Sequence, residues 1–105
     1  MAQEAQFGRR SFIKTTMILS AINGQKNMAK LLMEKGADVN ATSPYGWTAL
    51  MNAVYLGDAE MVQMLLDGGT DVNHKNYLGR TALFISEKTG KPEIMRMLKE
   101  AGAVE

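Results

Sequence analysis

The chain has little of several residue types that carry chemistry: no cysteine, one histidine, one tryptophan and two prolines in 105 residues. Without cysteine there are no disulfides, no thiol nucleophile and no cysteine-ligated zinc. The formal charge of +1 gives no strong field, so we expect neither nucleic acid nor an anionic membrane as partner. No apolar run approaches the ~20 residues of a membrane-spanning helix.

Catalytic constellations are missing from the sequence as well. The one histidine, His74, follows Asn73 in a turn-rich segment and has no second histidine or nearby acidic pair to share a metal. No glycine-rich phosphate loop follows a strand pattern, and the serines have no base beside them. We therefore expect no enzymatic activity, no metal and no cofactor.

What the chain does have is a repeat. Apolar residues make up 46% and charged residues 22%, which favours a folded domain. Twelve residues recur at a fixed offset of 33: Gly24, Gly57 and Gly90; Gly36, Gly69 and Gly102; Thr15, Thr48 and Thr81; Leu32, Leu65 and Leu98. Such a period indicates modules that cannot bury their apolar faces alone and must stack on their neighbours.

Each module is predicted to hold two helices. Thr48 is suited to cap the first helix and Gly57 to end it in a left-handed conformation. Asp58 is suited to cap the second helix, and Gly69 to close it. The turn formers that follow predict an extended finger over residues 70–80.

The repeated segments carry a family resemblance. Residues 46–57 are GWTALMNAVYLG and residues 79–90 are GRTALFISEKTG, and each precedes a second apolar segment such as MVQMLLDGGTDVN at 61–73. This pattern resembles the ankyrin repeat family, with Ala49 where the family usually has proline and Met51 where it usually has histidine. The resemblance implies an all-α ankyrin-repeat solenoid of stacked helix-turn-helix units with extended hairpin-like fingers.

The period also divides the chain. We expect an N-terminal extension at 1–10 and three repeats over 11–105, at about 11–43, 44–76 and 77–105. The third repeat carries Ser86, Glu87 and Lys99 where the second has Ala53, Val54 and Leu66. Because charges are costly to bury, these positions favour a free end and a nearly self-contained three-repeat unit.

Arg9 and Arg10 resemble the start of a bacterial twin-arginine export signal. The apolar run after them, residues 17–22, is shorter than the about 7–15 residues that such a signal needs. The same residues are required for the first helix of repeat one. We therefore favour the structural interpretation and an intracellular location.

Finger residues and outward first-helix residues are expected to form a concave face for another protein. Aromatic and arginine side chains dominate the energy of protein interfaces. The candidate partner-binding residues are Tyr45, Trp47, Asn52, Tyr55, Tyr77, Arg80 and Lys88. Other residues expected to point outward on this face are Leu19, Ile22, Asn23, Leu56, Leu78, Ile85 and Thr89.

Alternatives stay open at this point. Trp47 and Tyr77 are equally suited to packing against neighbouring fingers. The same apolar face would also serve a structural or homo-oligomeric unit, natural or engineered. From the family resemblance alone, Asn40 and Asn73 are similar to asparagines that asparaginyl hydroxylases modify.

Overall fold

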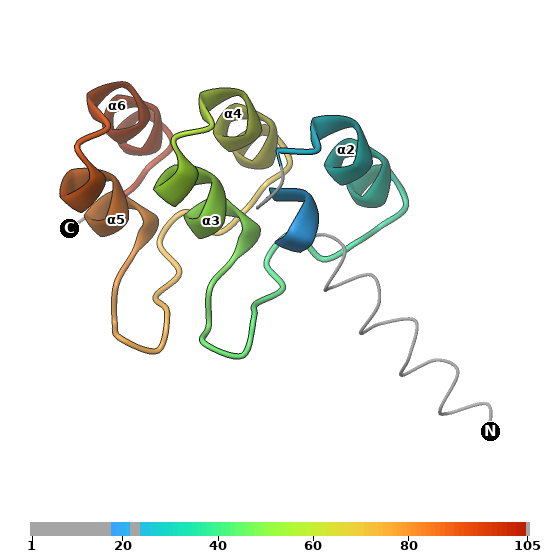
Figure 1. The fold of residues 1–105 in the computed structure, drawn as a ribbon, viewed down its shortest axis with the longest axis horizontal. Coiled ribbons are helices and arrows are strands. Elements are labelled where there is room, and N and C mark those ends of the chain that lie inside the picture. The colour runs from blue at the N-terminus through green and yellow to red at the C-terminus, as the bar shows by residue number, and fades with distance from the viewer. Residues whose placement is uncertain (1–17, 22–23, 105) are drawn as a thin grey trace.

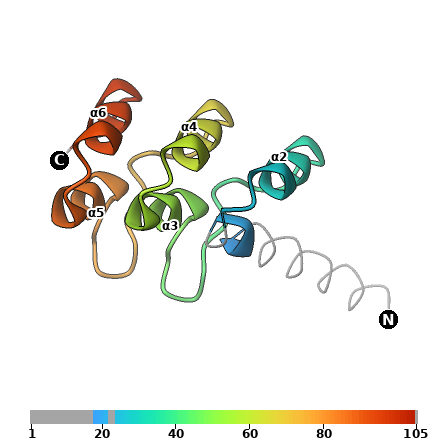
Figure 2. The same ribbon diagram turned by 45° about the horizontal axis from the view of Figure 1, so that its top comes forward.

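The helices form two layers in a linear stack. The computed structural model describes residues 18–21 and 24–104. It contains a helical segment at 18–21 and the helices α2 (Lys26–Glu34), α3 (Ala49–Leu56), α4 (Ala59–Asp67), α5 (Ala82–Thr89) and α6 (Pro92–Glu100). Helices α3 and α5 pack side by side in one layer, while α4 lies between α2 and α6 in the other (Figure 1). Figure 2 shows the same helix pairs stacked along one axis.

The predicted helix starts are confirmed, and Gly57 ends α3 in a left-handed conformation; α4 ends at Asp67 with Gly68 as its C-cap, and the left-handed Gly69 follows. The Thr48 hydroxyl accepts a hydrogen bond from the Met51 amide at 3.2 Å, and Thr81 caps α5 in the same way through Phe84. Asp58 caps α4 by accepting from the Met61 amide. Each such cap contributes about 1 kcal/mol. These caps fix the residues at which α3, α4 and α5 begin.

Two fingers project from the stack on one side (Figure 1). We define them as the first finger, residues 37–47, and the second finger, residues 70–80. In the first finger, the Gly46 amide donates to Ser43 and the Ser43 amide donates to Trp47, so the tip closes as a tight turn. Asn76, Gly79 and Arg80 repeat these bonds in the second finger. The predicted extended finger is therefore confirmed.

The core lies between the two helix layers. Leu50, Leu65, Leu83 and Leu98 are at most 1% exposed, and small residues such as Ala53 sit between them. Burying each leucine contributes about 2 kcal/mol, and the alanines let neighbouring helices approach closely. The 33-residue period thus relates Leu50 on α3 to Leu83 on α5, and Leu65 on α4 to Leu98 on α6.

The exposure of several third-repeat residues on α5 and α6 bears on the sequence-based expectations. Ile85, expected to point outward, is only 5% exposed and packs in the core cluster, so that prediction was wrong. Glu87 and Lys99 are exposed, as expected. Ser86 is 0% exposed despite its polarity, because its hydroxyl donates to the Leu83 carbonyl at 2.7 Å and needs no solvent. The twin-arginine-like pair Arg9 and Arg10 lies outside the described residues.

Candidate functional site

An aromatic hollow lies where the first finger meets α3. Its lining consists of Ile18, Ser43, Tyr45, Trp47, Asn52 and Tyr55. The Trp47 and Tyr55 rings meet edge to face, with centroids 6.1 Å apart and planes at 81°. The finger supplies Tyr45 and Trp47, while the adjacent helix supplies Asn52 and Tyr55. Four of the seven predicted partner-binding residues therefore lie around one hollow.

The polar member of this group is held in place. The Asn52 side-chain amide donates to the Thr48 carbonyl at 2.9 Å, one turn earlier in the chain. This bond leaves its side-chain oxygen as an acceptor beside the aromatic side chains of the hollow. Tyr45 is 76% exposed and Tyr55 58% exposed, so much of this aromatic surface faces solvent.

Trp47 and Tyr77 combine the two roles that the sequence left open. Trp47 is half-buried and packs against the core cluster, yet it also lines the hollow. The Tyr77 amide donates to the Tyr45 carbonyl at 3.2 Å, and its ring lies over Gly46. Nevertheless Tyr77 is 77% exposed. Trp47 and Tyr77 thus each make contacts within the fold, and each still exposes part of its aromatic ring to solvent.

The remaining two candidates, Arg80 and Lys88, lie beside Phe84 rather than in the hollow. The Arg80 guanidinium carbon is 5.2 Å from the centre of the Phe84 ring, and the Lys88 ammonium is 5.4 Å from it. Both distances are within the range of a cation–π interaction. Phe84 itself is half-buried, so one ring positions two exposed cations on the third repeat.

Asn40 and Asn73 link successive repeats, a role that the sequence analysis missed. The Asn40 side-chain oxygen accepts from the Asp71 amide at 2.6 Å, 31 residues along the chain. The Asn73 oxygen accepts from the Val104 amide at 3.0 Å, and its amide donates to the Gly102 carbonyl at 3.2 Å. The recurrence of asparagine at the period of the repeat is the signal that points to this role. Hydroxylation of either residue stays a prediction.

His74 makes a second contact between fingers that the sequence did not reveal. Its Nε2 lies 3.1 Å from the Gly46 carbonyl oxygen, so the imidazole joins the second finger to the first. This contact gives the histidine a structural role. Within residues 18–21 and 24–104, no group of three histidine, cysteine, aspartate or glutamate side chains is placed to hold a metal.

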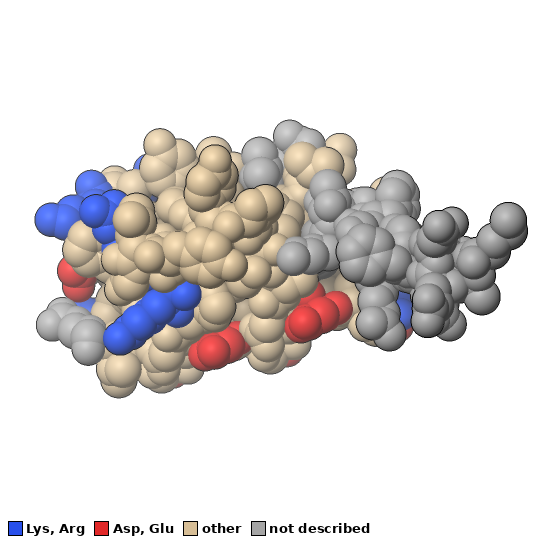
Figure 3. Space-filling view, turned by 90° about the horizontal axis from the view of Figure 1, so that it is seen from below, with Lys and Arg blue, Asp and Glu red and all other residues tan. Residues whose placement is uncertain are grey.

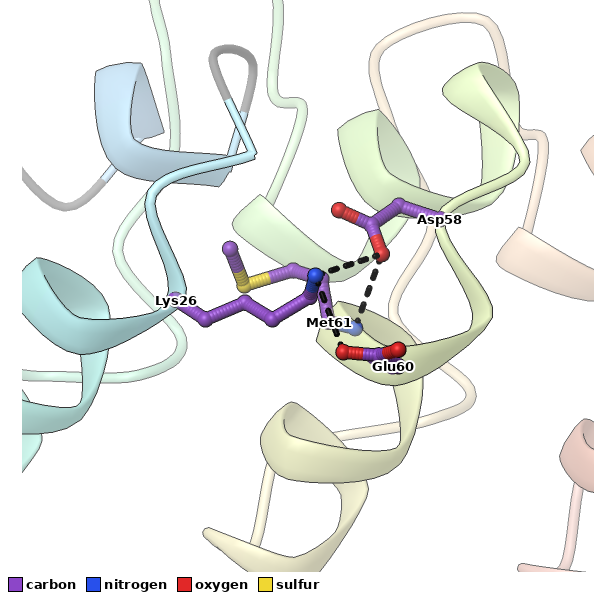
Figure 4. A network of polar contacts seen from close by, with 4 residues as sticks. All are labelled: Lys26, Asp58, Glu60 and Met61. Carbon is purple, nitrogen blue, oxygen red and sulfur yellow. Dashed lines mark hydrogen bonds and ion pairs between the residues drawn. The ribbon is translucent and has the colours of Figure 1, made fainter.

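An ion pair joins the first and second repeats on the opposite layer (Figure 4). The Lys26 ammonium is 3.0 Å from a Glu60 carboxylate oxygen and 4.0 Å from Asp58. The hydrogen bond to Glu60, helped by the charge of Asp58, raises the pKa of Lys26 above its usual 10.5. Asp58 also caps α4 through the Met61 amide, so one carboxylate serves both contacts.

The described part of the chain contains no helix long and apolar enough to cross a membrane.

Among the other residues expected to face outward, Leu19, Leu56 and Leu78 are exposed and Thr89 is half-buried. Ile22 and Asn23 lie outside the described residues. The face therefore extends beyond the hollow along both fingers and the first-helix layer.

Comparison with known proteins agrees with this architecture. The family model described as "Ankyrin repeats (3 copies)" matches residues 3–76. A 45-residue stretch is 49% identical to rat (Rattus norvegicus) "Ankyrin repeat and SAM domain-containing protein 6" and 44% identical to the mouse (Mus musculus) protein of that name. Each match covers 42% of this chain and 5% of the relative, so the chain spans a small part of these proteins.

Ankyrin repeats in general act as protein–protein interaction modules, and the family is in general a non-enzymatic scaffold. The family model covers well over half of the sequence, and the structure shows the helix pairs, fingers and linear stacking that the sequence resemblance implied. The chain belongs to the ankyrin repeat family.

Proposed function

We propose that this chain binds a partner protein through the face formed by its fingers and first helices. The binding face, as we use the term, consists of Tyr45, Trp47, Asn52, Tyr55, Tyr77, Arg80 and Lys88. The observation that carries the proposal is the exposure of three tyrosines on one face, at 76%, 58% and 77% for Tyr45, Tyr55 and Tyr77.

Exposed aromatic rings on a rigid scaffold favour binding for two reasons. Tyrosine offers a large contact area and loses few rotamers when it becomes ordered. Here Tyr55 is already held by its edge-to-face contact with Trp47, and the backbone that carries Tyr77 is joined to the Tyr45 carbonyl. A partner would therefore cover apolar area without first ordering the surface that it covers.

The proposal is tested by selecting peptides from a random display library with the purified chain and measuring the affinity of a selected peptide for variants. Tyr45→Ala and Tyr55→Ala should each weaken binding by about tenfold. Leu31→Ala is the matched control, because Leu31 is 47% exposed but lies on α2 in the other helix layer. All three truncated side chains are exposed, so the thermal melts should stay close to that of the parent chain.

Equal affinity of the selected peptides for the parent chain and for a Tyr45→Ala/Tyr55→Ala double variant would show that this face is not the binding surface. Self-association through the same face is the other proposal and makes a separate prediction. It requires a sedimentation mass that rises with concentration in the parent chain and not in the double variant. A constant monomer mass would contradict it.

A further inference from the structure

The binding face changes its chemistry from the second repeat to the third. Positions separated by one period occupy equivalent places, so Trp47 corresponds to Arg80 and Tyr55 to Lys88. In the second repeat these two positions hold the edge-to-face aromatic pair. In the third they hold two cations beside Phe84, which itself corresponds to Met51. The same pair of places is thus aromatic in one repeat and cationic in the next.

The two cations have no anionic partner within the described residues. The ion pairs found there are those of Lys26 with Asp58 and Glu60, on the other helix layer. Glu87 is adjacent to Lys88 in the chain but forms no ion pair with it. Glu87 occupies the place of the buried Val54 and lines a hollow together with Phe84 and Val104. Arg80 and Lys88 therefore remain available to an external anion.

The surface around the cations adds to this contrast. Viewed from the finger side, Lys and Arg gather toward the α5 end with an acidic side chain beside them, and further acidic side chains line one edge of a broad uncharged surface across the middle (Figure 3). The lining of the aromatic hollow contains no charged side chain. A single ligand crossing from the second repeat to the third would pass from an uncharged, aromatic surface to a cationic one.

We infer that the partner presents an extended segment in which an apolar side chain fills the hollow and a carboxylate lies between Arg80 and Lys88. This inference rests on the function proposed above and specifies the chemistry of the partner. The guanidinium offers the paired donors that match a carboxylate, and the ammonium adds a second charge.

The spacing between the two features follows from helix packing. Neighbouring packed helices lie about 8–10 Å apart, and an extended chain advances about 3.3 Å per residue. Successive side chains of an extended segment point to opposite faces, so two side chains that both contact the repeats lie an even number of residues apart. An apolar side chain in the hollow beside α3 and an acidic residue at α5 are therefore expected about two or four positions apart.

The test uses the same random peptide display with two forms of the chain: the parent and an Arg80→Glu/Lys88→Glu variant. The parent should select peptides with an aspartate or glutamate about two or four positions from an aromatic or aliphatic residue. The variant should select lysine or arginine at that position while keeping the apolar preference. Both cations are exposed, and a thermal melt of the variant checks that the fold is retained.

Defined peptides make the test quantitative. Replacing the selected acidic residue by glutamine should weaken binding to the parent chain by about fivefold. It should leave binding to an Arg80→Gln/Lys88→Gln variant unchanged. The difference should shrink as salt is added, because both cations are exposed.

Selection of apolar peptides with no acidic preference, or an acidic preference that survives the charge reversal, overturns this inference. Such a result leaves the proposed function standing, since that depends on the tyrosine variants. Peptides that ignore the Tyr45→Ala and Tyr55→Ala changes and the charge reversal alike would overturn the proposed function as well. The two failures are therefore distinguishable.

Discussion

Replacing Gly46 by alanine tests how closely the two fingers are joined. Gly46 has a φ of +80° and Gly79, at the same place in the second finger, has a φ of +75°. Alanine in this left-handed region costs about 1 kcal/mol at either position. The surroundings differ, however: a Cβ at Gly46 would lie 2.7 Å from a Tyr77 ring carbon and 3.0 Å from the Tyr77 amide nitrogen, whereas at Gly79 nothing lies within 4 Å.

The Tyr77 ring can rotate away, but its backbone amide moves only if the fingers separate. Separation would break the Tyr77 amide bond to Tyr45 and strain the His74 contact to the Gly46 carbonyl. Losing one such hydrogen bond costs about 1 kcal/mol, and the displaced ring adds about as much again. We expect Gly79→Ala to lower the free energy of unfolding by about 1 kcal/mol and Gly46→Ala to lower it by about 3 kcal/mol.

Urea titration followed by circular dichroism measures both values. With a slope of about 1.5 kcal/mol per molar urea, the two variants should differ in midpoint by more than about 1 M. If Gly46→Ala and Gly79→Ala are equally destabilised, then the backbone conformation alone sets the cost. The reasoning that the second finger packs rigidly against the first would then be refuted.

Three further changes probe contacts between and within repeats. Asn40→Ala removes the acceptor for the Asp71 amide and should lower the free energy of unfolding by about 1 kcal/mol in urea titration. Lys26→Met removes the pair with Glu60. Because folding raises the pKa of Lys26, its stabilisation is fully present at neutral pH and is lost as pH rises past its folded pKa, so the urea midpoints of parent and variant should converge above about pH 10.5. Asn76→Ala removes the acceptor for the Leu78 and Arg80 amides at a 5% exposed position and should lower the melting temperature by about 4 °C.

The sequence predicted the fold from features that act within one repeat. The caps at Thr48 and Asp58 and the left-handed Gly57 each depend on residues a few positions away, and all are confirmed. The exposed fraction of a residue was harder to predict, in part because a short polar side chain can hydrogen-bond to the backbone of its own helix and so be buried. Ser86 is buried because it bonds the helix backbone, and Ile85 is buried although its counterpart Asn52 in the second repeat is half-exposed.

The candidate site was predictable in composition but not in arrangement. Its residues were chosen as exposed aromatics and cations, yet nothing local shows that Tyr55 meets Trp47 edge to face or that Arg80 and Lys88 share the Phe84 ring. Contacts such as Asn40 to Asp71 join residues about one period apart, so their geometry depends on how the repeats stack. That stacking becomes known only once the whole chain is arranged in space.

The linear order of the helix pairs has a consequence for local opening. Helix α4 is covered by α2 on one side and by α6 on the other, so its amides should exchange with deuterium more slowly than those of α2 or α6. Fraying of the first repeat would uncover Ile18 and dismantle the hollow, while leaving the cationic pair on α5 and its finger undisturbed. A bound ligand that fills the hollow would consequently slow amide exchange in α2 more than in α6. Binding at the aromatic hollow would therefore weaken more on heating than binding at Arg80 and Lys88.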